Sequence, residues 1–255
     1  MADSALARSF APVKAYLQAS QAPIQSAALT LPLLLIYGLG VLLVPEAGNG
    51  VDIISIALSA ALSHLGNDRL LGYLGFYGAL ALADIGLIVW VSRQNKLSVR
   101  YFWPLLAESS VYALGIGMLA SSLTSDVTHF LSGPSLSTAD DGGRQFGLVA
   151  GIIVSAGAGL HEELVFRLLG IAGVARMWLG TEWRRLSWGL VAILLGTSVL
   201  FSAVHHLVEP FTLQAFVFRC FAGLLFGSLF LARGFAVAAW THALYDVWII
   251  VILGR

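Results

Sequence analysis

The chain of 255 residues has little charge and a single cysteine. Charged residues make up 11% of the sequence, against roughly 25% in an average soluble domain. Fourteen basic and fourteen acidic residues give a net charge of zero, and no basic run is present to neutralise a row of phosphates, which argues against a nucleic-acid partner. Because Cys220 has no second cysteine to pair with, an intrachain disulfide and a thiolate metal cluster are excluded.

Long apolar stretches are what the sequence has in abundance. Hydrophobic residues make up 58% of the chain, and a helix needs about 20 apolar residues to cross a hydrocarbon layer roughly 30 Å thick. Seven segments come close to this length or exceed it: 27–44, 73–91, 102–123, 146–175, 187–207, 213–232 and 235–253. The shorter apolar segment 51–65 is an eighth span, a re-entrant piece or an interfacial helix. We therefore expect an all-α polytopic bundle of seven to eight transmembrane helices.

The chain before the first span has its own pattern, and two polar breaks interrupt the apolar segments. Apolar and basic residues share helical spacing near the start: Leu6, Phe10, Val13 and Leu17, with Arg8 and Lys14 between them. This pattern is typical of an amphipathic helix on the membrane surface, and a loosely ordered leader is the alternative. We assign residues 1–25 to this segment and 26–255 to the bundle, with loops at 124–145 and 176–185.

The distribution of basic residues predicts the orientation in the membrane. Lys and Arg cluster before the first span, in 93–100 and in 176–185, which would place these segments in the cytoplasm. The assignment is self-consistent only if 51–65 does not cross, and counting spans then places Glu162 and His205 nearer opposite faces. No cleaved signal pattern is seen at the start, so we expect a multi-pass protein of a prokaryotic cytoplasmic membrane that inserts through its own spans.

The stretch HEELVFR, residues 161–167, places four ionisable side chains inside an otherwise apolar segment. An ionised side chain at bilayer depth costs at least about 2.5 kcal/mol, so such groups face a partner or a cavity. Glu163 and Arg167 are four residues apart, in the favourable order for an ion pair on one helix face, whereas Glu162 points about 100° away. With Glu163 neutralised by Arg167, Glu162 is suited to act as a general base. The alternative is an ion cluster that only packs helices.

Two further spans carry polar groups at helical spacing. His205 follows Phe201 by four residues, with His206 next to it, and Asp246 follows His242 by four residues. Each group taken alone is explained equally well by helix packing. Together, a glutamate, histidines and an aspartate from three spans can surround one water molecule, which is the outline of a hydrolytic site.

This pattern resembles the CPBP family of intramembrane endopeptidases, relatives of the type II CAAX prenyl protease. That family carries Glu-Glu-x-x-x-Arg, Phe-x-x-x-His and His-x-x-x-Asn/Asp motifs on successive membrane helices. The same three motifs begin here at Glu162, Phe201 and His242, in this order, within 146–253. In the first motif, the resemblance gives Glu163 and Arg167 a supporting structural role.

The resemblance also implies roles for the other motif residues. Glu162 would activate the attacking water, His205 would assist, and His242 with Asp246 would stabilise the oxyanion of the tetrahedral intermediate. Asp246 stands where prenyl-processing members have Asn, and an aspartate donates a hydrogen bond only when it is protonated. The apolar segment FAGLLFGSLFLARG, residues 221–234, is similar to the glycine-containing helix that precedes the family's last motif.

The family is regarded as glutamic rather than metal-dependent, so no cofactor is expected. The zinc motif His-Glu-x-x-His is absent from 161–165, because Val165 stands where the second histidine is needed. If a metal did take part, Glu162, His205 and His242 would bind zinc as three ligands plus water.

The implied substrate is a peptide or protein associated with membrane lipid, either a lipidated C-terminal segment or another membrane-anchored tail or small peptide. Two other functions stay open. One is a non-catalytic scaffold or immunity-type member of the same family, and the other is a transporter in which Glu108, Asp84, Glu162 and the histidines relay protons or bind a substrate. The simpler explanation is that Glu108 and Asp84 bridge helices by hydrogen bonds or line a cavity. Arg219 either snorkels or pairs within the bundle. No oligomeric state is assigned.

Overall fold

The computed structural model describes residues 2–44, 47, 98–132 and 147–253, together with isolated positions between 75 and 93. The predicted segment 51–65, most of the predicted span 73–91 and Asp84 lie outside the described residues. Within the described residues every regular element is a helix, which confirms the all-α prediction.

The described helices are named in chain order. The α-helices are α1 (Ala2–Gln21), α2 (Pro23–Leu43), α5 (Phe102–Ser132), α6 (Leu148–Gly157), α7 (Val174–Leu179), α8 (Trp188–His205), α9 (Leu213–Arg233) and α10 (Phe235–Asp246). Turns of 3-10 helix cover Val99–Tyr101 and Gly180–Glu182, and π-helical segments cover Ala158–Glu162, Leu164–Gly173 and Val247–Ile252. Ser187 and Thr212 cap α8 and α9 by accepting hydrogen bonds from backbone N–H groups of the first turn.

Six of the described helical segments are long and apolar enough to cross a membrane. They are Pro23–Leu43, Val99–Leu131, Leu148–Glu182, Trp188–His205, Leu213–Arg233 and Phe235–Ile252. Each corresponds to a span predicted from the sequence. The chain is therefore an integral, multi-pass membrane protein.

Both predicted loops begin later than expected. α5 continues through 124–132, where the hydroxyls of Thr124 and Thr128 donate hydrogen bonds to carbonyls four residues earlier. The predicted loop 176–185 starts inside α7, which ends at Leu179 and is followed by Gly180, a residue with φ of 74°. Hydroxyl side chains that bond back to a helix are compatible with it, so polar composition placed the start of the first loop too early.

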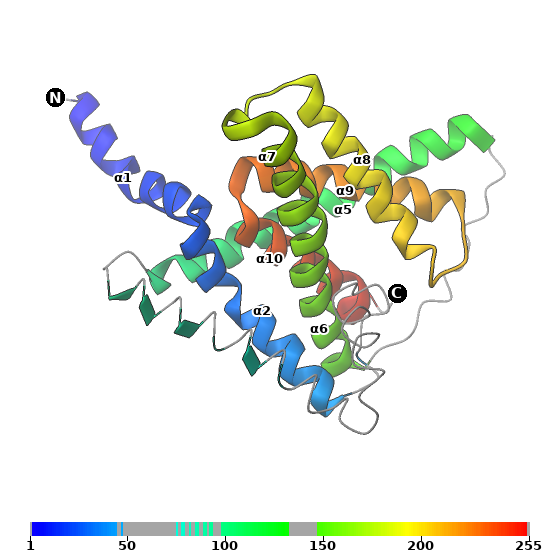
Figure 1. Ribbon diagram of the computed structural model, residues 1–255, viewed down its shortest axis with the longest axis horizontal. Coiled ribbons are helices and arrows are strands. Elements are labelled where there is room, and N and C mark those ends of the chain that lie inside the picture. Colours follow the sequence, from blue (N-terminus) through cyan, green and yellow to red (C-terminus); the bar gives the residue numbers. More distant parts are fainter. Residues whose placement is uncertain are drawn as a thin grey trace.

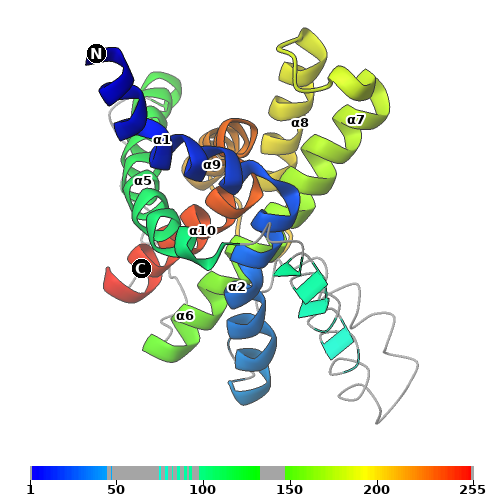
Figure 2. The same cartoon turned by 90° about the vertical axis from the view of Figure 1, so that its left-hand side faces the viewer.

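Helix α10 lies in the middle of the bundle and packs against α2, α5, α6 and α9 (Figures 1 and 2). Its inward surface is lined by small residues, and Ala236 and Ala239 are fully buried. The π-helical segment Ala158–Glu162 approaches this surface so closely that a Cβ added to Gly159 would lie 2.5 Å from the carbonyl oxygen of Ala239. Gly159 thus permits the contact that brings the charged stretch 161–167 against α10.

The N-terminal segment is helical, as one of the two sequence alternatives predicted. Helix α1 projects from the bundle at its start and meets the other helices at its C-terminal end (Figure 1). There the Tyr16 hydroxyl donates to Glu108 of α5, and Arg233 of α9 donates to Ser20 at 3.0 Å. Arg233 also binds both carboxylate oxygens of Glu108, at 2.6 and 2.9 Å. Glu108 therefore bridges helices, in agreement with the sequence interpretation.

Candidate active site

The charged stretch 161–167 lies in a distorted part of its span. The π-helical segments Ala158–Glu162 and Leu164–Gly173 meet at Glu163, where a regular α-helix was expected. π-Helical turns are rare and are frequently found at functional sites. The distortion places the two neighbouring glutamates against different partners.

Glu163 connects Arg167 to the last span. Its Oε2 lies 3.1 Å from Nε of Arg167, which confirms the predicted ion pair, and its Oε1 lies 2.8 Å from Nδ1 of His242. Because a carboxylate only accepts, Nδ1 of His242 donates this hydrogen bond, and the ring is held with Nε2 pointing away from Glu163. The family resemblance implied only a supporting structural role for Glu163, and its contact with His242 was not predicted.

Aromatic rings enclose the Arg167 guanidinium. Its central carbon lies 4.6 Å from the ring centroid of Phe201 and 5.7 Å from that of Phe226, distances at which a cation is attracted to the ring face. The Phe226 ring also stacks on His242, with centroids 4.6 Å apart. Phe226 lies within the segment 221–234 that the sequence singled out, but no local pattern indicated which of its side chains faces the site.

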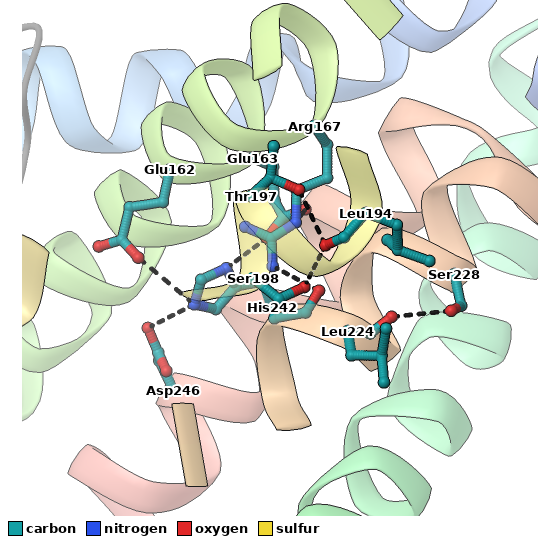
Figure 3. A network of polar contacts seen from close by, with 11 residues as sticks. Glu162, Glu163, Arg167, Leu194, Thr197, Ser198, Leu224, Ser228, His242 and Asp246 are labelled. Carbon is teal, nitrogen blue, oxygen red and sulfur yellow. Dashed lines mark hydrogen bonds and ion pairs between the residues drawn. The ribbon is translucent and has the colours of Figure 1, made fainter. Parts of the chain in front are cut away.

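Glu162 and Asp246 are directed at the same nitrogen of His242 (Figure 3). From Nε2 of His242, Oε2 of Glu162 lies 3.9 Å away and Oδ2 of Asp246 lies 3.7 Å away. The same Glu162 oxygen lies 3.7 Å from Nε2 of His205. The structure thus brings together all four residues that the sequence selected, at separations longer than a hydrogen bond.

The tautomer of neutral His205 follows from its backbone contact. Nδ1 lies 2.8 Å from the carbonyl oxygen of Phe201. A carbonyl oxygen accepts and does not donate, so Nδ1 carries the hydrogen and Nε2 is an acceptor. Two acceptors, His205 Nε2 and Glu162 Oε2, therefore face each other, and a group with two O–H donors is the complement of this pair.

The expectation that Glu162 and His205 lie nearer opposite faces of the membrane is wrong. The span Leu148–Glu182 is longer than one crossing needs, and α8 returns antiparallel to it. Glu162 lies 20 residues before Glu182, and His205 lies 17 residues after Trp188. Both are therefore roughly 25–30 Å from the connecting loop at about 1.5 Å per residue, and so at similar depth.

The two neighbouring histidines lie outside this group of four residues. His206 packs against Phe211 and Phe216, with centroids 5.0 and 6.0 Å apart. His161 is buried and meets the Tyr37 ring of α2 edge-on at 4.7 Å. Spacing alone did not separate His205 from His206, because adjacent residues on a helix differ only by the face they occupy.

Access to the site is uneven. The Glu163 and Arg167 side chains are 0% and 2% exposed, whereas those of His205 and Asp246 are 12% and 18% exposed. The ion pair of Glu163 with Arg167 is therefore sealed, and the group is more accessible on the side of His205 and Asp246. Among the described residues, no three His, Cys, Asp or Glu side chains are arranged to hold a metal ion.

Comparison with known proteins gave one family. Residues 144–248 match the sequence model of the family described as type II CAAX prenyl endopeptidase Rce1-like. The matched range contains all six residues selected from the three motifs. Searches of curated proteins and of solved structures gave no match.

Proposed function

Because residues 144–248 match the model of the type II CAAX prenyl endopeptidase Rce1-like family, we propose that the protein is an intramembrane endopeptidase in which Glu162 activates water. The observation that carries the proposal is the convergence of Glu162, His205 and His242 from three helices, with 3.7 and 3.9 Å between their polar atoms. A water oxygen placed beside these atoms lies within the roughly 2.6–3.2 Å that proton transfer needs.

The hydrogen positions orient this water. It donates one O–H to the Glu162 carboxylate and the other to Nε2 of His205, since both atoms are acceptors. Its lone pairs then point away from the two acceptors, toward a substrate carbonyl carbon. Glu162 takes the proton as the C–O bond forms, and returns it to the amide nitrogen as the C–N bond breaks.

His242 and Asp246 stabilise the oxyanion in this mechanism. With Nδ1 bound to Glu163, protonation of Nε2 gives an imidazolium whose charge is balanced by Glu163 and whose free N–H points toward the reacting atoms. Asp246 donates a second hydrogen bond from a protonated carboxyl group. The ion pair with Arg167 holds Glu163 in place, so Glu163 is a positioning residue for His242.

The substrate in this proposal is a membrane-associated peptide or protein. The bundle lies in the lipid of a prokaryotic cytoplasmic membrane, and the accessible side chains His205 and Asp246 mark the entry side. Neither zinc nor another cofactor takes part, because the carboxylate and imidazole groups supply the base and the donors.

The test is cleavage of membrane-anchored peptides by the purified protein in detergent. We expect Glu162→Gln and His205→Ala each to lower kcat by about 10²–10⁴-fold, the usual contribution of general base catalysis. Glu182→Gln and His129→Ala change the same residue types at exposed positions and should keep wild-type turnover. Near-normal cleavage by Glu162→Gln would disprove the assignment.

Incubation with a strong chelator separates the two catalytic classes. The carboxylate mechanism predicts unchanged turnover, whereas a zinc enzyme loses activity as the metal is removed. Restoration of lost activity by added zinc would replace the proposed mechanism with the metal-dependent one.

A further inference from the structure

Arg219 has a hydrogen-bonding capacity that its neighbours do not use. It lies in the second turn of α9, and its Nη2 donates to the carboxylate of Glu209 in the loop between α8 and α9. Its Nη1 is buried and has no hydrogen-bond partner among the described residues. A guanidinium carries five donors in a fixed planar fork, so an unsatisfied nitrogen beside a satisfied one favours a planar anion.

Arg219 lies on the accessible side of the proposed active site. The loop that carries its partner is attached to the end of α8, because the backbone N–H of Glu209 donates to the carbonyl oxygen of His205 at 3.0 Å. The start of α9 is held against α8 by a hydrogen bond from the Ser202 hydroxyl to the carbonyl of Phe216, at 2.8 Å.

Exposure distinguishes this pair from a structural ion pair. The Glu209 side chain is 49% exposed and that of Arg219 is 20% exposed, so the carboxylate is free to move toward water while the arginine stays fixed in the helix. Exposed ion pairs contribute about 0–1 kcal/mol, so a competing carboxylate displaces Glu209 at little cost.

We propose that Arg219 binds a carboxylate of the substrate, close to the bond that is cleaved, and thereby determines specificity. This inference rests on the proposed peptidase function. The carboxylate belongs either to the C-terminus of the substrate or to an Asp or Glu side chain a few residues from the scissile bond. An extended chain advances about 3.3–3.6 Å per residue, so only a carboxylate within a few residues reaches both Arg219 and the water beside His205.

Binding is measured first with catalytically blocked Glu162→Gln protein, so that the result does not depend on turnover. Three peptides of one sequence are compared: a free C-terminal acid, a C-terminal amide, and an amide with one internal Asp near the cleavage position. We expect at least one of the two carboxylate peptides to bind about ten- to a hundredfold more tightly than the plain amide, the range for a hydrogen bond between charged groups. Which of them binds tightly identifies the source of the carboxylate.

Arg219 is then changed in the blocked protein and in the wild type. In the blocked protein, Arg219→Gln should remove the preference for a carboxylate, Arg219→Lys should keep part of it, and Arg176→Gln, at an exposed position in α7, should have no effect. Glu209→Gln should tighten binding of the carboxylate peptide by a few-fold, because it removes the competitor. In the wild type, Arg219→Gln should raise KM for the preferred peptide more than for the plain amide.

The outcomes separate this inference from the peptidase proposal. Equal binding of all three peptides to blocked protein would overturn the role of Arg219, even if the wild type cleaves them. An equal loss of cleavage of every peptide in Arg219→Gln would also overturn it, since Arg219 would then act on the catalytic residues. A carboxylate preference in binding with no cleavage by the wild type would support the site and count against the proposed peptidase activity.

Discussion

Two arginine–glutamate pairs inside the bundle have the same chemistry but different surroundings. Arg233 uses its donors on both oxygens of Glu108 and on Ser20, and Tyr16 donates to the same glutamate. This cluster is closed, because its polar groups bind one another. Arg167 instead binds one oxygen of Glu163, and the other oxygen of Glu163 accepts a hydrogen bond from His242.

In the second cluster, carboxylate oxygens of Glu162 and Asp246 lie 3.7–3.9 Å from the nearest imidazole nitrogens of His205 and His242. These separations are longer than a hydrogen bond, so we call this cluster open. Charge inside a membrane protein therefore does not by itself mark a reactive centre. The closed cluster fastens α1 to α5 and α9, while the open one presents acceptors at a spacing that suits a bound water. The spacing of the polar atoms, rather than the number of charges, distinguishes the two regions.

The largest expected effect comes from neutralising Glu163, the carboxylate that contacts both Arg167 and His242. Glu163→Gln leaves the Arg167 guanidinium buried without its counter-charge, and removing one partner of a buried pair costs about 3–5 kcal/mol. The substitution also weakens the hydrogen bond that orients the His242 ring. Cleavage should therefore fall even at temperatures where the variant is folded. The matched change, Glu108→Gln, should lower stability by less, because that pair is 10% and 17% exposed, and should keep cleavage.

Thermal unfolding in detergent and peptide cleavage measure these two properties separately. Equal loss of activity in both variants, after comparison at equal folded fraction, would contradict the distinction between a closed and an open cluster.

A smaller effect is expected at the edge of the open cluster. Asp246→Asn introduces an amide, which donates a hydrogen bond without first having to be protonated, so kcat should stay within about tenfold of the wild type. Asp246→Ala removes the donor and should lower kcat by about 10²-fold. Steady-state kinetics on one peptide decides the matter. If Asp246→Asn were as inactive as the alanine variant, Asp246 would be needed as a carboxylate and not as a donor.

The smallest effect is expected in the closed cluster. Tyr16→Phe removes one hydrogen bond to Glu108 and should cost about 1 kcal/mol, with cleavage unchanged. Burial and the neighbouring Glu108 raise the pKa of Tyr16 above its ordinary value. Because the folded protein then holds this proton more tightly than the unfolded chain, the stabilisation by Tyr16 is complete below a pH of about 10 and is lost as the pH rises further.

Unfolding measured between pH 8 and 11 tests this dependence. The wild type should lose stability relative to Tyr16→Phe only in the upper part of the range. A constant difference across the whole range would show that Tyr16 does not ionise with the predicted linkage.

Sequence reasoning succeeded where the contact is local to one helix. The ion pair of Glu163 with Arg167 and the approach of His242 to Asp246 both follow from a spacing of four residues. The six described spans were predicted because a helix of about 20 apolar residues has the length needed to cross the hydrocarbon core. The family resemblance likewise depended on three local motifs.

Contacts between helices required the tertiary structure. The pairing of Glu163 with His242, and of Arg233 with Glu108, joins residues far apart in the chain. The depth of Glu162 relative to His205 was mispredicted because counting assumes spans of equal length. The span Leu148–Glu182 is longer and partly π-helical.

The amino-acid sequence by itself determined the membrane class, the helical segments and the residues that share a helix face, because each of these depends on hydrophobicity and on the fixed periodicity of a helix. Only the tertiary structure decided which faces meet. Helix depth and crossing, and the close approach at Gly159, arise from packing of the whole bundle, and no local stretch of sequence encodes them.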